Sequence, residues 1–179
     1  MTLIEKADQL AERAHTGQTR KDAPTPYIEH PRAVAAILKD AGFDETVVAA
    51  ALVHDVVEDT PVTLKDVRQE LGDEVARLVA PVTHDSTLSW RDKKLAYIEA
   101  VRTAPPEAKA IALADKIHNA ESLLNAHAAQ GQRVWGYFNA SREDKLWFEE
   151  AMLEMLRTSW RHPLIERYGA LVERLRALN

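Results

Sequence analysis

The most constraining feature of this sequence is an apolar run at residues 47–57 that contains two ionisable side chains. The run reads VVAAALVHDVV, and His54 and Asp55 are its polar members. A helix that is apolar on all sides is usually buried. An unpaired buried carboxylate is costly, so Asp55 requires a cation, hydrogen bonds or a metal ion. The run therefore predicts a buried helix that carries a polar site.

The rest of the chain also favours helices. Only 6 of its 179 residues are glycine, and residues with high helix propensity dominate. Apolar spacing, capping residues and prolines predict helices at about 3–15, 31–42, 44–59, 63–72, 73–84, 90–103, 106–129, 141–158 and from 163 onwards. An ordered loop is expected at 16–30, and residues 130–140 are ambiguous. We predict an all-α bundle of about eight to ten helices, with residues 1–179 forming a single domain.

Composition narrows the class of protein. The chain has no cysteine, which excludes disulfides, thiolate metal sites and a cysteine nucleophile and agrees with a cytoplasmic location. Its first residues do not read as a signal peptide, and no apolar run approaches the roughly 18–20 residues that span a membrane. The net charge of −5 disfavours nucleic-acid binding. We therefore expect a cytoplasmic protein that binds neither nucleic acid nor membrane, in an oligomeric state left open.

Acidic residues cluster at the end of the apolar run. Glu58 follows His54 by four residues and Asp55 by three, and Asp59 follows Asp55 by four. Residues three and four apart share one face of a helix. Three carboxylates so close together would repel one another strongly without a cation. The spacing thus presents an imidazole and three carboxylates to one region.

Two distant residues are candidates for the same site. Asp115 interrupts the apolar stretch AIALADKIHN at 110–119, with Asn119 one turn further on. Alone, Asp115 is explained by a salt bridge to another helix; beside the first cluster, a shared metal ion explains it better. His30 ends the expected loop and is the natural fourth ligand. His162 also precedes a proline, but it has no acidic cluster beside it and is interpreted as an ordinary helix start.

Two imidazoles and two carboxylates form a mixed nitrogen and oxygen site. Such a site suits Mn²⁺, Fe²⁺ or Zn²⁺ and leaves positions open for water. A divalent ion can acidify that water and polarise a phosphoryl oxygen. Glu58 and Asp59, next to the ligands, are suited to position the water and move its proton. The residues themselves therefore predict a metal-dependent phosphohydrolase.

Five motifs then point to a family. They are HTGQ at 15–18, RKD at 20–22, PYIEHP at 26–31, HDVVED at 54–59 and LADKIHN at 113–119. In their order and spacing, over about residues 5–125, the chain resembles the hydrolase domain of the Rel/Spo alarmone enzymes. In size it is similar to their single-domain relatives, the small alarmone hydrolases. The C-terminal helices, about 141–179, match this family only vaguely.

The resemblance implies an α-helical HD fold with one Mn²⁺ that hydrolyses the 3′-pyrophosphate of (p)ppGpp to give GDP or GTP and pyrophosphate. The implied metal ligands are His30, His54, Asp55 and Asp115. The implied catalytic pair is Glu58 and Asp59. The implied contacts to the nucleotide are Arg20, Lys21, Asp22, Asn119 and Ser122, with the arginine against the nucleobase.

Two departures from the family pattern make the expected pocket less cationic. Glu121 stands where a basic residue is usual, and Asp22 stands where a serine is common. Glu121 favours an alternative substrate, namely another ribose-phosphorylated nucleotide such as NADPH or an adenosine analogue of the alarmone. A non-catalytic nucleotide sensor would require loss of a ligand or of the acidic pair, and all six residues are present.

Other residues have two interpretations. Arg91, Lys93 and Lys94 could form a solvated helix face or reach substrate phosphates. His84 has no supporting pattern, and His118 is interpreted as a packing or supporting residue. Aromatic residues of the C-terminal third could cover the mouth of the site, form a dimer surface or fill the core; these are Trp135, Tyr137, Phe138, Trp147, Phe148 and Trp160.

Overall fold

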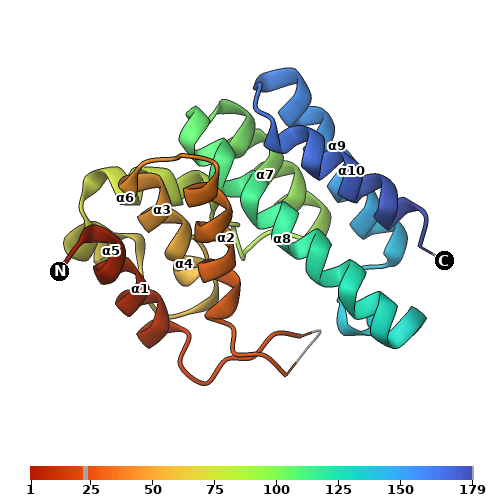
Figure 1. Ribbon diagram of the computed structural model, residues 1–179, viewed down its shortest axis with the longest axis horizontal. Helices are drawn as coiled ribbons and strands as arrows, with labels where there is room; N and C mark the ends of the chain where they lie inside the picture. The colour runs from red at the N-terminus through yellow and green to blue at the C-terminus, as the bar shows by residue number, and fades with distance from the viewer. Residues whose placement is uncertain (22–23, 179) are drawn as a thin grey trace.

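The structure is a computed structural model, and it describes residues 1–21 and 24–178. Over these residues it contains ten α-helices, two 3₁₀ helices and one isolated β-bridge between Thr19 and Pro26 (Figure 1). The α-helices are α1 (Leu3–Ala14), α2 (Glu29–Asp40), α3 (Glu45–Leu52), α4 (Val56–Asp59), α5 (Leu64–Leu71), α6 (Asp73–Val79), α7 (Trp90–Thr103), α8 (Pro106–Gln130), α9 (Arg142–Ser159) and α10 (Leu164–Arg176). The 3₁₀ helices are η1 (Ala80–Val82) and η2 (Gly131–Tyr137). The predicted all-α fold is confirmed.

Local signals in the sequence account for several helix ends. Thr2 and Thr63 each begin a helix with a capping box, in which the third helical residue, Glu5 or Asp66, bonds back to the cap. One such cap is worth about 1 kcal/mol. Gly72 joins α5 to α6 at a φ of 95°, a conformation that glycine adopts without strain.

The helix predicted at 44–59 is divided in two, and this is a correction. Helix α3 ends at Leu52 and the single turn of α4 begins at Val56. The ring Nδ1 of His54 lies 2.7 Å from the carbonyl oxygen of Ala51. A continuous helix would give that oxygen to the N–H of Asp55. The oxygen instead faces the imidazole and, at 3.5 Å, the backbone N–H of His54, so the regular ladder stops and Asp55 becomes the residue that precedes α4.

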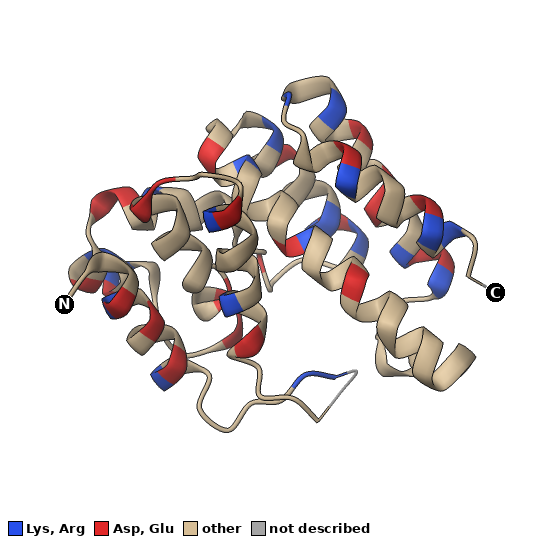
Figure 2. Ribbon diagram, viewed as in Figure 1, with Lys and Arg blue, Asp and Glu red and all other residues tan. Residues whose placement is uncertain are grey.

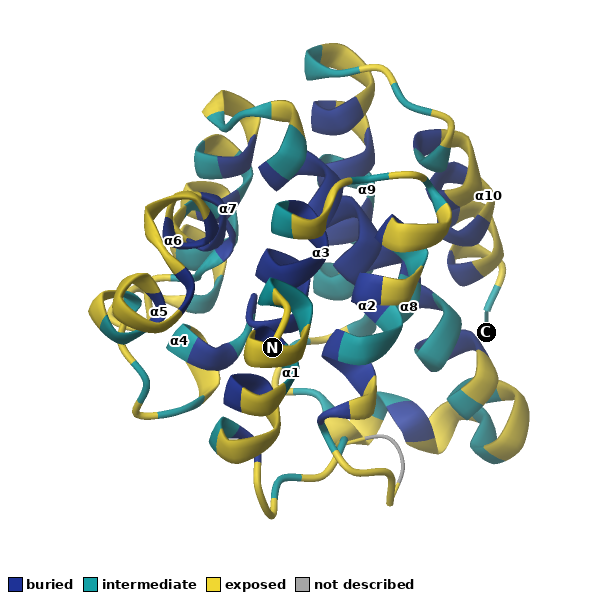
Figure 3. Cartoon of the chain, turned by 60° about the vertical axis from the view of Figure 1, so that its left-hand side comes forward, coloured by how far each residue is buried: buried dark blue, intermediate teal, exposed yellow. Residues whose placement is uncertain are grey.

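Helix α8 is the element on which both halves of the chain pack. Helices α2, α3 and α6 contact it from the N-terminal half, and α7 and α10 contact it from the C-terminal half. In Figure 1 it runs through the middle of the molecule, and in Figure 3 buried residues gather where α2, α3 and α8 meet. Every residue of α8 from Ala108 to Ile117 is buried. A polar residue in this stretch is therefore held rigidly inside the core.

Charges of both signs occupy the outer helices. In Figure 2 acidic and basic residues are interspersed along α1, α9 and α10. In the part of the chain that the structure describes, no helix combines the length and the apolar character needed to cross a bilayer.

Candidate metal centre and active site

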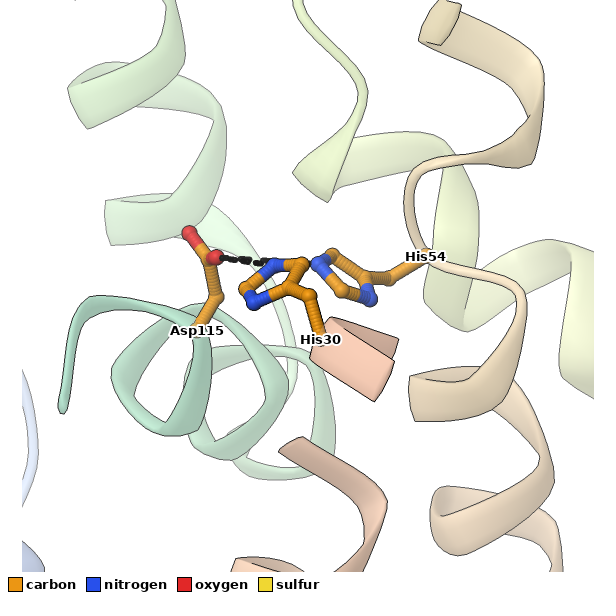
Figure 4. Close-up of side chains that lie close together, drawn as sticks. All are labelled: His30, His54 and Asp115. Atoms are coloured by element: carbon orange, nitrogen blue, oxygen red, sulfur yellow. Dashed lines mark ion pairs between the residues drawn. The ribbon is translucent and has the colours of Figure 1, made fainter. Parts of the chain in front are cut away.

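Three separate elements bring three of the predicted ligands together. His30 lies in the first turn of α2, His54 in the break after α3, and Asp115 in the middle of α8 (Figure 4). One donor atom from each residue lies within 4.8 Å of the other two. The Oδ1 atom of Asp115 is 3.1 Å from Nε2 of His30 and 3.6 Å from Nε2 of His54.

The fourth predicted ligand, Asp55, lies beside both histidines. Its Oδ1 is 3.1 Å from Nε2 of His54, and its Oδ2 is 3.3 Å from Nε2 of His30. The hydroxyl of Tyr27 donates to Oδ2 at 2.6 Å. The break between α3 and α4 therefore places the Asp55 carboxylate against both imidazoles.

The surroundings of the His54 ring show whether these residues fit a metal ion. Its Nδ1 donates to Ala51, and its buried Nε2 faces the carboxylates of Asp55 and Asp115 at 3.1 Å and 3.6 Å without forming a hydrogen bond. A ring whose far nitrogen is fixed by a carbonyl, and whose near nitrogen faces carboxylates without bonding to them, has the arrangement of a metal ligand. Although burial lowers it, the carboxylates of Asp55 and Asp115 raise the pKa of His54 well above its usual range. The same two carboxylates would attract a divalent cation to this nitrogen.

The carboxylates supply the charge that such a cation requires. Although burial raises it, the charge of Lys116 and the hydrogen bond from His30 hold the pKa of Asp115 well below its usual range. Similarly, burial raises the pKa of Asp55, but His54 and His30 lower it to a net value well below its usual range. Two ionised carboxylates with two imidazoles form a mixed nitrogen and oxygen donor set. The cluster therefore fits one divalent metal ion.

His118 supports His30 from behind. The two Nδ1 atoms lie 2.7 Å apart. Burial, and then the charge of His30, lower the pKa of His118 to about 4, so His118 is neutral and has a ring nitrogen that can accept the N–H of His30. This bond leaves Nε2 of His30 directed to the centre, as is usual for a histidine ligand.

The predicted catalytic pair lies next to the cluster, and its two members are in different environments. The Oε2 atom of Glu58 is 2.8 Å from Nδ1 of His84. Burial raises the pKa of Glu58, but the hydrogen bond from His84 outweighs it and the net shift is downward. Burial, and then the charges of Asp55 and Glu58, raise the pKa of Asp59. A pair of carboxyl groups whose pKa values are moved apart is suited to act as base and acid.

A cavity of about 650 Å³ opens onto these residues. Its walls combine cationic and aromatic side chains, namely Lys94, Lys116, Lys145, Trp90, Tyr97, Phe138 and Phe148. Of the basic residues at the start of α7, Lys94 therefore faces the site. Arg91 is half exposed and its guanidinium lies over the ring of Trp147. Two of the C-terminal aromatics, Phe138 and Phe148, line the cavity rather than only filling the core.

The predicted substrate residues are placed unequally. Arg20 and Lys21 line the cavity. The side-chain amide of Asn119 donates to Oδ1 of Asp115 at 2.6 Å, and its oxygen accepts from Arg20 at 3.2 Å. Ser122 lines a smaller neighbouring cavity of about 390 Å³ instead of the main one. Asp22 lies outside the described residues.

The Glu121 carboxylate does not reach the main cavity. It accepts a hydrogen bond from Arg167 on α10 at 2.7 Å and lines neither of the two cavities just described. Its negative charge is therefore neutralised by another helix. The residue that favoured a less anionic substrate therefore lies outside the lining of the main cavity.

Sequence reasoning missed two residues that contact the predicted ligands or the catalytic pair, Tyr27 and His84. Tyr27 lies within a quoted motif, three residues from His30, and that spacing was a usable signal. His118, which was interpreted from the sequence as a packing or supporting residue, contacts His30. His84 belongs to the loop between η1 and α7 and reaches Glu58 from a different part of the chain. No local pattern points to it.

Comparison with known proteins agrees with this geometry. The HD domain family matches residues 7–145. The human guanosine-3′,5′-bis(diphosphate) 3′-pyrophosphohydrolase MESH1 is 45% identical over 142 residues, covering 76% of this chain and 78% of the human protein. The bifunctional (p)ppGpp synthase/hydrolase SpoT of Escherichia coli is 39% identical over 137 residues, covering 73% of this chain and 19% of SpoT.

Similarity extends to a solved structure. A metazoan ortholog of SpoT, described as hydrolysing ppGpp, superposes with a TM-score of 0.83 at 31% identity. The match covers 100% of this chain and 98% of that one. The chain therefore belongs to the HD-domain family, in the branch that contains MESH1 and the hydrolase region of SpoT.

Proposed function

We propose that this chain is a metal-dependent guanosine-3′,5′-bis(diphosphate) 3′-pyrophosphohydrolase that releases pyrophosphate from (p)ppGpp. The observation that carries the proposal is the convergence of His30, His54 and Asp115 beside Asp55, on one wall of a cavity that lysines also line. The activity for which MESH1 and SpoT are named supports the choice of substrate. Residues 1–179 form one domain in this proposal, with the site in the core at about 5–125 and the C-terminal helices closing the cavity.

The proposed cofactor is one Mn²⁺ held by His30, His54, Asp55 and Asp115. The mixed nitrogen and oxygen donor set supports Mn²⁺, with Fe²⁺ and Zn²⁺ as the other ions to test. When bound, a divalent ion lowers the pKa of a water ligand and polarises a phosphoryl oxygen. Tyr27, His118 and Asn119 hold the ligand side chains in place through the hydrogen bonds described above.

The acidic pair divides the proton transfers. Glu58, which remains ionised, accepts a proton from the water that attacks the phosphorus bonded to the ribose 3′ oxygen. Asp59, whose pKa is raised, gives a proton to that oxygen as the bond to phosphorus breaks. The products are a free 3′-hydroxyl and pyrophosphate, and the proton that Glu58 gains is passed to solvent while Asp59 takes one back, so atoms and protons balance.

Cationic side chains hold the substrate in this proposal. Lys94, Lys116 and Lys145 offset the charge of the phosphates from the cavity wall. Arg20 lies against the nucleobase, as the family resemblance implies. Lys21, Asp22, Asn119 and Ser122 are the remaining proposed contacts.

The alternative substrate, NADPH or an adenosine analogue, rested on the acidic Glu121. Since this carboxylate pairs with Arg167, it adds no repulsion in the main cavity. The proposal therefore keeps (p)ppGpp as the substrate.

A side-by-side rate comparison of ppGpp, NADPH and adenosine 3′-diphosphate with Mn²⁺ tests the proposal. We expect ppGpp to turn over fastest, with pyrophosphate detected by phosphorus NMR. The variant Asp115→Asn should be inactive, and Asp40→Asn, at an exposed position at the end of α2, should match the wild type. Faster turnover of either other nucleotide, or no release of pyrophosphate, would contradict the proposal.

A further inference from the structure

The loop between η1 and α7 brings a histidine to the catalytic pair. The ring of His84 is largely buried, and its Nδ1 lies 2.8 Å from Oε2 of Glu58. The backbone N–H of His84 donates to the same oxygen at 3.3 Å. Both bonds end on Oε2, and neither involves the second carboxylate oxygen, Oε1. One side of the carboxylate is thus engaged.

A lysine determines which ring nitrogen of His84 carries the proton. The Nζ atom of Lys94 is 3.0 Å from Nε2 of His84. A lysine ammonium donates hydrogen bonds and cannot accept them. Nε2 of His84 is therefore the acceptor, and the ring proton lies on Nδ1, where it donates to Glu58.

Stacking holds the same ring in one orientation. The rings of His84 and Tyr97 lie 4.1 Å apart at an interplanar angle of 7°. Tyr97 is itself buried in α7. The imidazole of His84 is consequently held at Nε2 by Lys94, at Nδ1 by Glu58 and on its face by Tyr97.

We propose that His84 is a positioning residue, which donates from Nδ1 to Glu58 and holds that carboxylate so that Oε1 can accept the proton of the nucleophilic water. The inference rests on the proposed function of Glu58. His84 itself touches neither the proposed metal ligands nor the reacting atoms.

The surrounding charges explain why this donor matters. Burial and the nearby Asp55 raise the pKa of Glu58, and the bonds from His84 reverse the shift. Burial lowers the pKa of His84, as do the charges of Lys94 and Lys116, while Glu58 raises it, with a net downward shift. The neutral imidazole therefore acts on Glu58 by hydrogen bonding. Loss of the donor should raise the pKa of Glu58.

The first test compares two replacements of His84. His84→Phe keeps an aromatic ring against Tyr97 but removes the donor, whereas His84→Asn restores a side-chain N–H near the Nδ1 position. Because a hydrogen bond to a charged group is worth about 1.5–3 kcal/mol, we expect kcat of His84→Phe to fall by about 10- to 100-fold, with little change in KM. The acidic limb of its kcat–pH profile should move to higher pH, and His84→Asn should recover most of both losses.

Matched controls separate positioning from damage to the fold. His162→Phe makes the same change in a ring that stacks on Trp160, away from the cavity, and should leave kcat unchanged. Metal content should equal that of the wild type in all three variants. A His84→Phe enzyme with wild-type kcat and an unmoved acidic limb would overturn the proposal, as would the same losses in His84→Asn.

A second test needs no substrate. In protein labelled with ¹⁵N-histidine and loaded with diamagnetic Zn²⁺, His84 should be neutral and protonated on Nδ1 near pH 7. Lys94→Met should weaken that tautomer preference. Protonation on Nε2, or a charged ring at pH 7, would refute the inference. If wild-type protein failed to hydrolyse ppGpp, the proposed function would fail, while this measurement would still decide whether His84 donates from Nδ1 to Glu58.

Discussion

Nε2 of His30 lies 3.1 Å from Oδ1 of Asp115, so the first turn of α2 and the middle of α8 meet at a single point. The meeting point exists because α2 packs directly on α8. Asp115 is also anchored by Asn119 one turn along α8 and by Lys116 beside it. A carboxylate held in this way has little freedom to move away from a bound cation.

The first prediction concerns this carboxylate. Asp115→Asn keeps the shape of the side chain but removes its charge, so affinity for a divalent ion should fall more than about 100-fold, beyond the roughly 10- to 100-fold typical of losing a ligand's hydrogen-bonding partner. Metal titration and elemental analysis measure the change. Asp40→Asn serves as the control, and an undiminished metal content in Asp115→Asn would place the ion elsewhere.

The second prediction separates catalysis from metal binding. Glu58→Gln should lower kcat by about 10²- to 10⁴-fold, because an amide cannot accept the proton of the attacking water. The ion should remain bound, since Glu58 is not among the proposed ligands. Rates and metal content are measured on the same preparation. A parallel loss of both would mean that Glu58 is a ligand.

The third prediction concerns Tyr27, whose hydroxyl is 2.6 Å from Asp55 and 3.1 Å from Asp59. Burial, and then the charges of these carboxylates, raise the pKa of Tyr27, so it remains a donor at all ordinary pH values. Tyr27→Phe should weaken metal binding by about 10- to 100-fold without unfolding the protein. Metal titration with a thermal melt distinguishes this result from general destabilisation. An unchanged metal affinity would contradict it.

The fourth prediction links activity to stability at Lys94. Burial, and then the charge of Lys116, lower the pKa of Lys94 from 10.5 to about 8 in the folded protein. Its ammonium is therefore unfavourable in the native state at neutral pH. Lys94→Met should raise the free energy of unfolding by about 1–2 kcal/mol at pH 7, after discounting for solvent screening, while lowering activity.

The difference in the free energy of unfolding between the wild type and Lys94→Met should depend on pH. Between pH 8 and 10.5 the unfolded chain binds a proton at Lys94 that the native protein has lost. The wild type therefore gains stability from this group as pH rises through that window, and its deficit relative to Lys94→Met should shrink. Denaturant unfolding at pH 7 and pH 9.5 checks this. A constant difference between the two proteins would rule out the lysine as its source.

Most of the helices could be predicted because their signals are local. The predicted segments at 63–72, 90–103 and 106–129 correspond closely to α5, α7 and α8. Apolar spacing and capping act over three or four residues, a range that the sequence displays directly. Two segments differ. The helix expected at 73–84 ends at Val79 and is followed by the 3₁₀ helix η1, and the helix expected at 44–59 is divided where a side-chain bond from His54 to Ala51 replaces a backbone bond. The spacing of apolar residues does not predict this replacement of a backbone hydrogen bond by a side-chain one.

The sequence by itself determined the helical class, the family and the chemical types of the candidate ligands, since each depends on residue identity and short spacing. Tertiary structure alone decided which side chains meet. In the folded chain Glu121 pairs with Arg167, Lys94 lines the cavity, and His84 contacts Glu58. The physical reason is that these contacts join residues on different elements of the fold. Their distances follow from how buried faces pack around α8, and no short stretch of sequence contains that information.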